Sequence, residues 1–274
     1  MELKIALIRQ VFANTGAIAE LPKALAHARS QGAQLAVLPE LPLNPWLPAT
    51  KTRLDDEAEP PVGPRHRAMC EAARKVGIAL IGGAIIRDPN SGRCHNTALA
   101  FNRSGELVGS YRKLHLPEEE GFWETSHYDP GDKPPSVIDG FPMRFGIQIC
   151  SDVNRPEGSH LLGALGAEVI VCPRATEAAT FERWRTVLTA NALTSCTYVI
   201  SVPRPQPEFD VPLGGPSFAV GPSGDVLIES TEPITLVSIE RNVLEQARRR
   251  YPGYLSMRAE LYAEGWKSVA RIFR

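Results

Sequence analysis

The sequence predicts an α/β fold in which a mixed β-sheet is covered by helices. Apolar runs rich in branched residues alternate with segments of helical spacing along most of the chain. Two pairs of short runs are joined by the turn sequences RSGE and PSGD, which indicate hairpins and therefore antiparallel strands. Because no break in composition marks a domain boundary, residues 1–274 are predicted to form one domain.

In the first half of the chain, strands and helices are expected to alternate. Residues 3–8 (LKIALI) have the apolar character of a buried strand. A helix is predicted next, because Ile18, Leu21 and Leu25 recur at helical spacing and Gly32 closes the segment. The remaining elements of this half are a strand at 34–40, a helix at 66–75, a strand at 77–86 and a hairpin at 96–113.

The second half repeats this alternation and ends in a basic helix. The expected elements are a strand at 143–150, a helix at 157–167, a strand at 168–173, a helix at 181–195, a strand at 197–203, a hairpin at 217–230 and a strand at 234–240. Alternating helices and strands with interspersed hairpins are typical of mixed sheets that carry helices on their faces.

Composition and charge exclude several classes of function. Hydrophobic residues make up 43% of the chain and charged residues 22%, as in water-soluble globular proteins. A formal net charge of −1 argues against nucleic acid or an anionic membrane as a partner. There is no apolar run of the roughly 20 residues that a membrane span requires. The first residues, MELKIALIRQV, resemble a strand and not a signal peptide, so a cytoplasmic location is predicted.

The cysteines form neither a disulfide framework nor a metal site by their spacing. The chain has five, an odd number, and none is part of a CxxC pair. In a reducing compartment they are expected to be free thiols, any of which can be reactive. No metal and no cofactor is predicted. The five are Cys70, Cys94, Cys150, Cys172 and Cys196.

Three predicted strands end abruptly in a polar, chemically reactive residue. AVLPE ends in Glu40, GSYRK in Lys113 and GIQIC in Cys150. In α/β sheets, functional groups gather where strands end and loops begin. If these strand ends lie together, a carboxylate, an ammonium group and a thiol converge on one site.

Such a site has the groups needed for acyl transfer. Cys150 would attack a carbonyl or nitrile carbon, and Glu40 would remove its proton. Lys113 and the backbone N–H of Ser151 would stabilise the resulting oxyanion. Each residue also has an ordinary structural interpretation, as a turn cap (Glu40), a solvated lysine and a core cysteine. His115 and Asp152 leave a Cys–His–Asp arrangement open as well.

The segments around these three residues resemble the nitrilase superfamily of carbon–nitrogen hydrolases. The resemblance rests on LAVLPEL around Glu40, YRKLHLP around Lys113 and GIQICSDVNRPE around Cys150, which match the family's three motifs in order and approximate spacing. Further similarities are HYDPGD, LGAEVIVCP, GPSGDVL and the tail RRRYPGYLSMRAELY. The resemblance therefore covers nearly the whole chain.

The resemblance implies a four-layer α-β-β-α sandwich with two mixed β-sheets, assembled as a homodimer or higher homo-oligomer. It implies that Glu40 is the general base, Lys113 the oxyanion stabiliser and Cys150 the nucleophile that forms a thioester. Many members use a second glutamate, and Glu124 stands at the matching offset before the DPGD sequence. Alternatives for this second carboxylate are Glu118, Glu119 and Glu120.

The substrate-binding residues are expected near the nucleophile and at a neighbouring strand end. Ser151 and Asn154 stand where this chain departs from the family pattern. Arg174 follows a predicted strand and would bind a substrate carboxylate, unless it pairs with a nearby glutamate. Trp123 is expected to form a wall of the pocket, whereas Trp184 has the helical spacing of a core residue.

The favoured function is hydrolysis of a small linear amide or N-carbamoyl (ureido) compound, with release of ammonia or amine. A nitrilase that attacks a C≡N group is the first alternative. A catalytically silent dimeric binding module is the second. The expected partner is a small-molecule amide, ureido or nitrile substrate.

Overall fold

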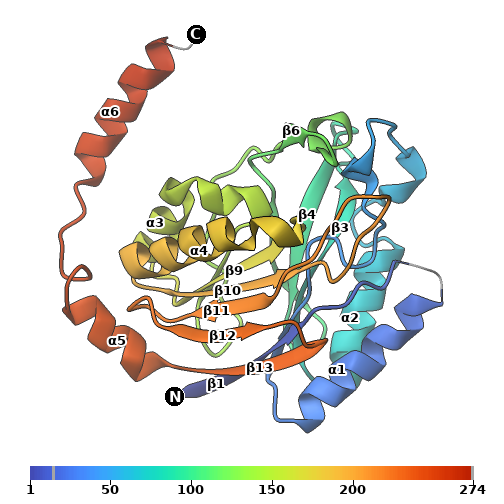
Figure 1. Ribbon diagram of the computed structural model, residues 1–274, viewed down its shortest axis with the longest axis horizontal. Helices are drawn as coiled ribbons and strands as arrows, with labels where there is room; N and C mark the ends of the chain where they lie inside the picture. The colour runs from blue at the N-terminus through green and yellow to red at the C-terminus, as the bar shows by residue number, and fades with distance from the viewer. Residues whose placement is uncertain (14–15, 273–274) are drawn as a thin grey trace.

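Two main β-sheets pack against each other between layers of helices in the computed structural model, which describes residues 1–13 and 16–272 (Figure 1). Each sheet combines parallel and antiparallel neighbours. The first has the strand order β13-β1-β2-β3-β4-β5. Its strands are β1 (Glu2–Ile8), β2 (Leu35–Val37), β3 (Ala79–Arg87), β4 (Cys94–Phe101), β5 (Leu107–Arg112) and β13 (Ile234–Glu240).

The second sheet has the order β12-β11-β10-β9-β8. Strands β8, β9 and β10 are parallel, with β8 at one edge of the sheet, and β11 and β12 are antiparallel strands on the other side. The strands are β8 (Phe145–Ile147), β9 (Val169–Arg174), β10 (Tyr198–Pro203), β11 (Ser217–Val220) and β12 (Val226–Ser230). A separate small hairpin joins β6 (Glu118–Glu119) to β7 (Phe122–Trp123).

Helices cover the outer face of each sheet (Figure 1). The first sheet carries α1 (Leu21–Ser30) and α2 (Pro64–Val76), and the second carries α3 (Pro156–Ala164) and α4 (Phe181–Ser195). After β13 the chain forms α5 (Arg241–Arg249) and α6 (Ala259–Ile272), and α6 extends away from the sheets. Short 3-10 helices are η1 (Ala17–Glu20), η2 (Leu47–Ala49), η3 (Asp55–Glu57), η4 (Glu124–Ser126), η5 (Cys150–Asn154) and η6 (Ala178–Thr180).

The four layers follow from strands that are apolar on both faces. In β1, Ile5 and Leu7 point into the core between the sheets. Ala6 and Ile8 point the other way, into the core beneath α1 and α2. The side chains of a strand alternate between its faces, so a continuous apolar run can serve two cores. Strand β9 divides its residues in the same way between the inter-sheet core and the core beneath α3 and α4.

The predicted fold class, two mixed sheets between helix layers, is confirmed. Among the strands and α-helices, the β6–β7 hairpin and the separate helix α6 were not predicted, and neither were the short 3-10 helices. The strand expected at 34–40 is shorter, since β2 ends at Val37 and Pro39 and Pro42 follow. Proline lacks the N–H that would continue a sheet ladder. In the part of the chain that the structure describes, no helix is long and apolar enough to cross a bilayer.

Candidate active site

The first sheet brings Glu40 and Lys113 to one edge. Strand β2 runs parallel to β3, and β3, β4 and β5 are successively antiparallel, so β5 runs in the direction of β2. The carboxyl ends of β2 and β5 therefore lie at the same edge of the sheet. Lys113 directly follows β5, and Glu40 comes three residues after the end of β2.

Lys113 lies between two carboxylates. Its Nζ is 2.8 Å from Oε1 of Glu40 and 2.6 Å from Oε1 of Glu124. All three side chains are buried. Charge-assisted hydrogen bonds of this length are among the strongest that side chains form. Of the four glutamates considered for the second carboxylate, Glu124 contacts Lys113, whereas Glu118, Glu119 and Glu120 are exposed.

The carboxylate of Glu40 is also held from two other sides. Asn96 Nδ2, on β4, donates to Oε1 at 2.7 Å, and the backbone N–H of Ala175 donates to Oε2 at 2.8 Å. The loop after Glu40 is clamped by the buried Arg204, which donates to the carbonyl oxygens of Glu40 and Leu41 at 2.9 and 2.8 Å. These bonds fix both the carboxylate and the backbone that carries it.

Cys150 stands at a sharp bend between β8 and α3. Its φ of 48° is left-handed, an unusual conformation for a residue with a Cβ. The Sγ donates to the carbonyl oxygen of Ala175 at 3.3 Å, so the thiol and Glu40 contact the same residue. The side chain belongs to the core between the sheets and also lines a cavity.

Asp152 holds the bend that carries Cys150. Its carboxylate accepts the backbone N–H groups of Ile149 at 3.1 Å, Leu114 at 3.2 Å and His115 at 2.9 Å. It also accepts the hydroxyl of Tyr111 at 2.9 Å and bonds Nδ1 of His115 at 2.8 Å. Asp152 therefore ties the segment after β5 to the segment after β8. The His115–Asp152 pair exists, but the Cys150 thiol donates to Ala175 and not to that histidine.

Burial perturbs the acid–base properties of the three central groups. Burial, together with the charge of Glu40, raises the pKa of the Cys150 thiol well above its ordinary value. Burial alone would lower the pKa of Lys113, but the charges of Glu124 and Glu40 outweigh it and raise the pKa. Burial raises the pKa of Glu124 to about 8, although Lys113 opposes this shift. At neutral pH the thiol is therefore protonated and the lysine is charged.

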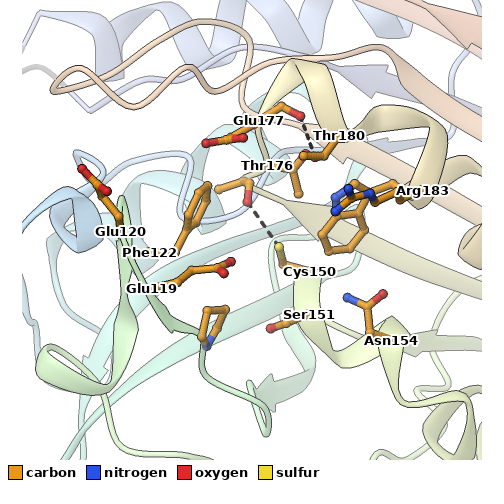
Figure 2. A pocket seen from close by; sticks show the side chains of 13 residues that line it. Glu119, Glu120, Phe122, Cys150, Ser151, Asn154, Thr176, Glu177, Thr180 and Arg183 are labelled. Carbon is orange, nitrogen blue, oxygen red and sulfur yellow. Dashed lines mark hydrogen bonds between the residues drawn. The ribbon is translucent and has the colours of Figure 1, made fainter.

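Cys150 lines a cavity of about 550 Å³ (Figure 2). This volume is in the range typical of small-molecule sites. The predicted residues Ser151 and Asn154 lie on its wall. The other lining residues are Pro117, Glu119, Glu120, Phe122, Ala175, Thr176, Glu177, Thr180, Arg183 and Trp184.

Two predicted substrate-binding residues lie elsewhere. In the β6–β7 hairpin, Glu119 is opposite Phe122 and Glu118 is opposite Trp123. Opposite residues share a face, so Phe122 lines the cavity while the ring of Trp123 faces Lys51, whose Nζ is 3.9 Å from the ring centroid.

Arg174 is fully buried and does not line the cavity. Its Nε donates to Ser201 Oγ at 2.9 Å, and its two terminal nitrogens donate to Thr176 and Pro216 at 2.5 Å each. With these donors occupied by protein atoms, Arg174 is a structural residue and not the substrate-binding residue that its strand-end position predicted. Neither Glu177 nor Glu182 is among these partners.

Several residues of the site were missed by the sequence reasoning. Asn96 and Arg204 occupy a strand and a strand end, and no local pattern singles them out. Trp184, predicted as a core residue, packs against the core and also lines the cavity. Among residues 1–13 and 16–272, no group of three or more His, Cys, Asp or Glu side chains is arranged to hold a metal ion.

A thiol that lines a cavity, together with a buried lysine bridged by two carboxylates, supplies the groups that acyl transfer requires. The family model for carbon-nitrogen hydrolases matches residues 7–249, and the chain belongs to this family. It is a carbon–nitrogen hydrolase of the nitrilase superfamily, as the resemblance of its motifs implied.

Known relatives agree with this assignment. The chloroplastic omega-amidase of Arabidopsis thaliana is 31% identical over 261 residues, which cover 89% of this chain and 69% of the relative. A variant of an amidase from Nesterenkonia, solved in complex with butyramide, superposes with a TM-score of 0.76 at 25% identity and covers 96% of both chains. A carbon–nitrogen hydrolase from Helicobacter pylori has the same fold, with a TM-score of 0.81 at 21% identity over 96% of this chain and 98% of the other.

Proposed function

We propose that the protein hydrolyses the carbon–nitrogen bond of a small linear primary amide and releases ammonia. The observation that carries this proposal is the placement of Lys113 between Glu40 and Glu124, with Glu40 and Cys150 joined through Ala175. The similarity to an omega-amidase and to an amidase with bound butyramide favours amides over nitriles.

In the proposed reaction, Cys150 attacks the amide carbon while Glu40 takes the thiol proton. A base is needed because burial raises the pKa of the thiol. Lys113 and the Ser151 N–H stabilise the oxyanion, which has a new C–S bond. The C–N bond then breaks, and ammonia leaves with the proton that Glu40 had taken.

Water completes the cycle. Glu40 removes a proton from a water molecule, whose oxygen attacks the thioester carbon. The C–S bond breaks and the sulfur regains a proton, so the net reaction converts an amide and water into a carboxylic acid and ammonia. Glu124 holds Lys113 in place from the side opposite Glu40 throughout.

The test is ammonia release from butyramide, from an N-carbamoyl amino acid and from butyronitrile. We expect turnover of the amide by the wild type and no detectable turnover by Cys150→Ala. Cys70→Ala, which changes a partly exposed cysteine on α2, is the matched control. Equal rates for the wild type and Cys150→Ala would contradict the proposal.

The panel also separates the alternatives. Turnover of the nitrile without the amide would identify a nitrilase, and turnover of the ureido compound alone would identify an N-carbamoyl amidohydrolase. If none of the three is hydrolysed, intact-mass measurement after brief exposure to each compound decides the matter. An acyl adduct on Cys150 would show a trapped intermediate, whereas its absence would favour the silent binding module.

We also propose that the protein is a homodimer in which α6 packs on a second copy. Helix α6 extends away from the sheets, and its large apolar side chains are exposed (Figure 1). Trp266 is 54% exposed and Leu261 is 62% exposed, which is costly for side chains of this size. Residues of the same kind on the segment before α6 are Tyr251, Tyr254, Leu255 and Met257.

Sedimentation of the wild type and of Leu261→Asp/Trp266→Asp tests the assembly. We expect dimers for the wild type and monomers for the double variant, and Glu264→Lys on the same helix is the control. A monomeric wild type would contradict the homodimer. The single domain and the cytoplasmic location stay predictions.

A further inference from the structure

The wall of the cavity around Cys150 carries charges of both signs that do not neutralise one another. Three glutamates line it, Glu119, Glu120 and Glu177, together with Arg183. Among the described residues, none of these four charged groups forms an ion pair or hydrogen bond with another side chain. Charged groups that face a cavity without protein partners are available to a ligand.

The two kinds of charge come from different walls. Glu119 and Glu120 belong to the β6–β7 hairpin, and Glu177 follows the end of β9. Arg183 lies in the first turns of α4. In the view of Figure 2, the three glutamates lie on one side of Cys150, and Arg183 lies on the other side, as does Asn154.

This separation disfavours a ligand with a single charge. A tail with only a carboxylate would meet Arg183 but would be repelled by three glutamates. A tail with only an ammonium group would bind the glutamates and leave Arg183 unsatisfied beside it. A tail with both groups satisfies both walls, because electrostatic complementarity excludes wrong partners as well as attracting the right one.

We propose that the preferred substrates are primary amides whose far end carries both an ammonium group and a carboxylate, as in the side-chain amides of α-amino acids. Arg183 binds the carboxylate through paired N–H groups, and Glu119 and Glu177 bind the ammonium group. The neutral amide then lies at Cys150. This inference rests on the proposed amidase function and names the substrate class of the same site.

The size of the site fits this class. Glutamine and asparagine are far smaller than a cavity of about 550 Å³, so each can enter with bound water. Arg183, Glu119 and Glu120 are exposed at the cavity wall. Solvent screens such groups, so each is expected to change selectivity about tenfold and not by many orders of magnitude.

The experiment uses two sets of four amides of matched length. The first set is glutamine, the monoamide of glutaric acid, γ-aminobutyramide and butyramide, which have both charges, the carboxylate only, the ammonium only and neither. The second set, one carbon shorter, is asparagine, the monoamide of succinic acid, β-alaninamide and propionamide. The measured quantity is kcat/KM for ammonia release by the full-length wild type.

We expect the doubly charged amide of at least one set to exceed each of its three analogues by about tenfold or more. For each variant, kcat/KM for the doubly charged amide is divided by kcat/KM for one of its analogues. With the carboxylate-free analogue as the divisor, Arg183→Gln should lower this ratio by about tenfold. With the ammonium-free analogue as the divisor, the double variant Glu119→Gln/Glu177→Gln should lower the ratio by a similar factor. Ratios within one variant cancel any general loss of activity.

Two neighbouring substitutions serve as controls. Arg185→Gln removes a guanidinium on α4 that is already paired with Glu229 at 3.0 Å. Glu118→Gln removes a carboxylate on the other face of the β6–β7 hairpin. Both should leave the two ratios unchanged.

The outcomes separate this inference from the proposed function. Equal rates across each set, with turnover that depends on Cys150, would overturn the inference and leave the amidase function standing. A preference for the analogue with one charge would also overturn it. If the wild type hydrolyses no amide of either set, the proposed function fails, and the inference fails with it.

Discussion

Glu40 and Cys150 bind opposite groups of one residue, Ala175. The N–H of Ala175 donates to Oε2 of Glu40 at 2.8 Å, and its carbonyl oxygen accepts the Sγ hydrogen of Cys150 at 3.3 Å. Ala175 directly follows β9, a central strand of the second sheet. The proposed base from the first sheet and the proposed nucleophile from the second are therefore held by the same strand end, which would favour a reactive geometry.

Glu40→Gln is expected to lower kcat for amide hydrolysis by about 10²- to 10⁴-fold, because an amide cannot accept the thiol proton. It should also destabilise the fold by about 1–3 kcal/mol. Both oxygens of Glu40 accept hydrogen bonds, and the amide nitrogen of glutamine would face a donor at one of them.

Steady-state kinetics and urea unfolding of this variant measure the two effects. Glu182→Gln, an exposed glutamate on α4, is the control and should behave as the wild type. A kcat within threefold of the wild type would show that Glu40 is not the base.

Glu124 should make stability fall as the pH rises from about 4.5 to about 8. Burial raises its pKa from 4.5 to about 8 in the folded protein. Between these values the folded state binds more protons than the unfolded state, so the free energy of unfolding decreases with pH. The raised pKa of Lys113 adds stability that is lost only above its ordinary value of 10.5, outside this window.

Glu124→Gln removes this titration, and its melting temperature should therefore decline less between pH 5 and pH 8 than that of the wild type. Glu118→Gln, with an exposed carboxylate, should keep the wild-type slope. Parallel curves for the wild type and Glu124→Gln would contradict a raised pKa at this position.

Asp152→Asn is expected to lower the free energy of unfolding by about 2–4 kcal/mol. The carboxylate accepts three backbone N–H groups and a tyrosine hydroxyl, and an asparagine side chain has one acceptor oxygen for them. Chemical denaturation measures the change. Asp139→Asn breaks an exposed pair with Arg144 and should cost under about 0.5 kcal/mol. Equal losses in the two variants would show that Asp152 is not a structural anchor.

The strand-end pattern located Glu40, Lys113 and Cys150 because chain direction alone decides which edge of a sheet a strand end reaches. The pattern could not decide toward which face of the sheet the side chain at a strand end points. Arg174 has the parity of Ile170 and Cys172, which pack beneath α3 and α4, so its side chain is buried on that side.

The β6–β7 hairpin is a second case in which the face was not predicted correctly, because Trp123 was expected to form a wall of the pocket. Phe122 lines the cavity and Trp123 does not, because neighbouring residues of a strand face opposite ways. The register of a two-residue strand cannot be read from so short a sequence. Glu124 was selected by resemblance alone, since its contact with Lys113 depends on how this hairpin returns to the first sheet. Sequence periodicity thus predicted the layers of the fold and the edge of the sheet at which the strand ends meet. Tertiary packing determined toward which face each side chain points.

The position of Glu40 also depends on Arg204. It is fully buried directly after the end of β10, and its guanidinium donates to the carbonyl oxygens of Glu40, Leu41 and Asn44. Leu41 has a left-handed φ of 47°, so the backbone next to the proposed base is strained and needs these bonds. The carboxylate of Glu208 neutralises the buried charge at 2.7 Å.

Arg204→Lys keeps the charge but loses the planar set of donors, because an ammonium group cannot reach the three carbonyl oxygens at once. We expect kcat for butyramide to fall about tenfold or more with a smaller change in KM, since Glu40 shifts while the cavity wall around Cys150 remains. Arg204→Met should in addition lower the free energy of unfolding by about 3–5 kcal/mol, because Glu208 loses its buried partner. Arg185→Lys, at an exposed pair, controls for the loss of a guanidinium. If Arg204→Lys unfolds more easily but keeps the wild-type kcat, Arg204 stabilises the fold without positioning Glu40.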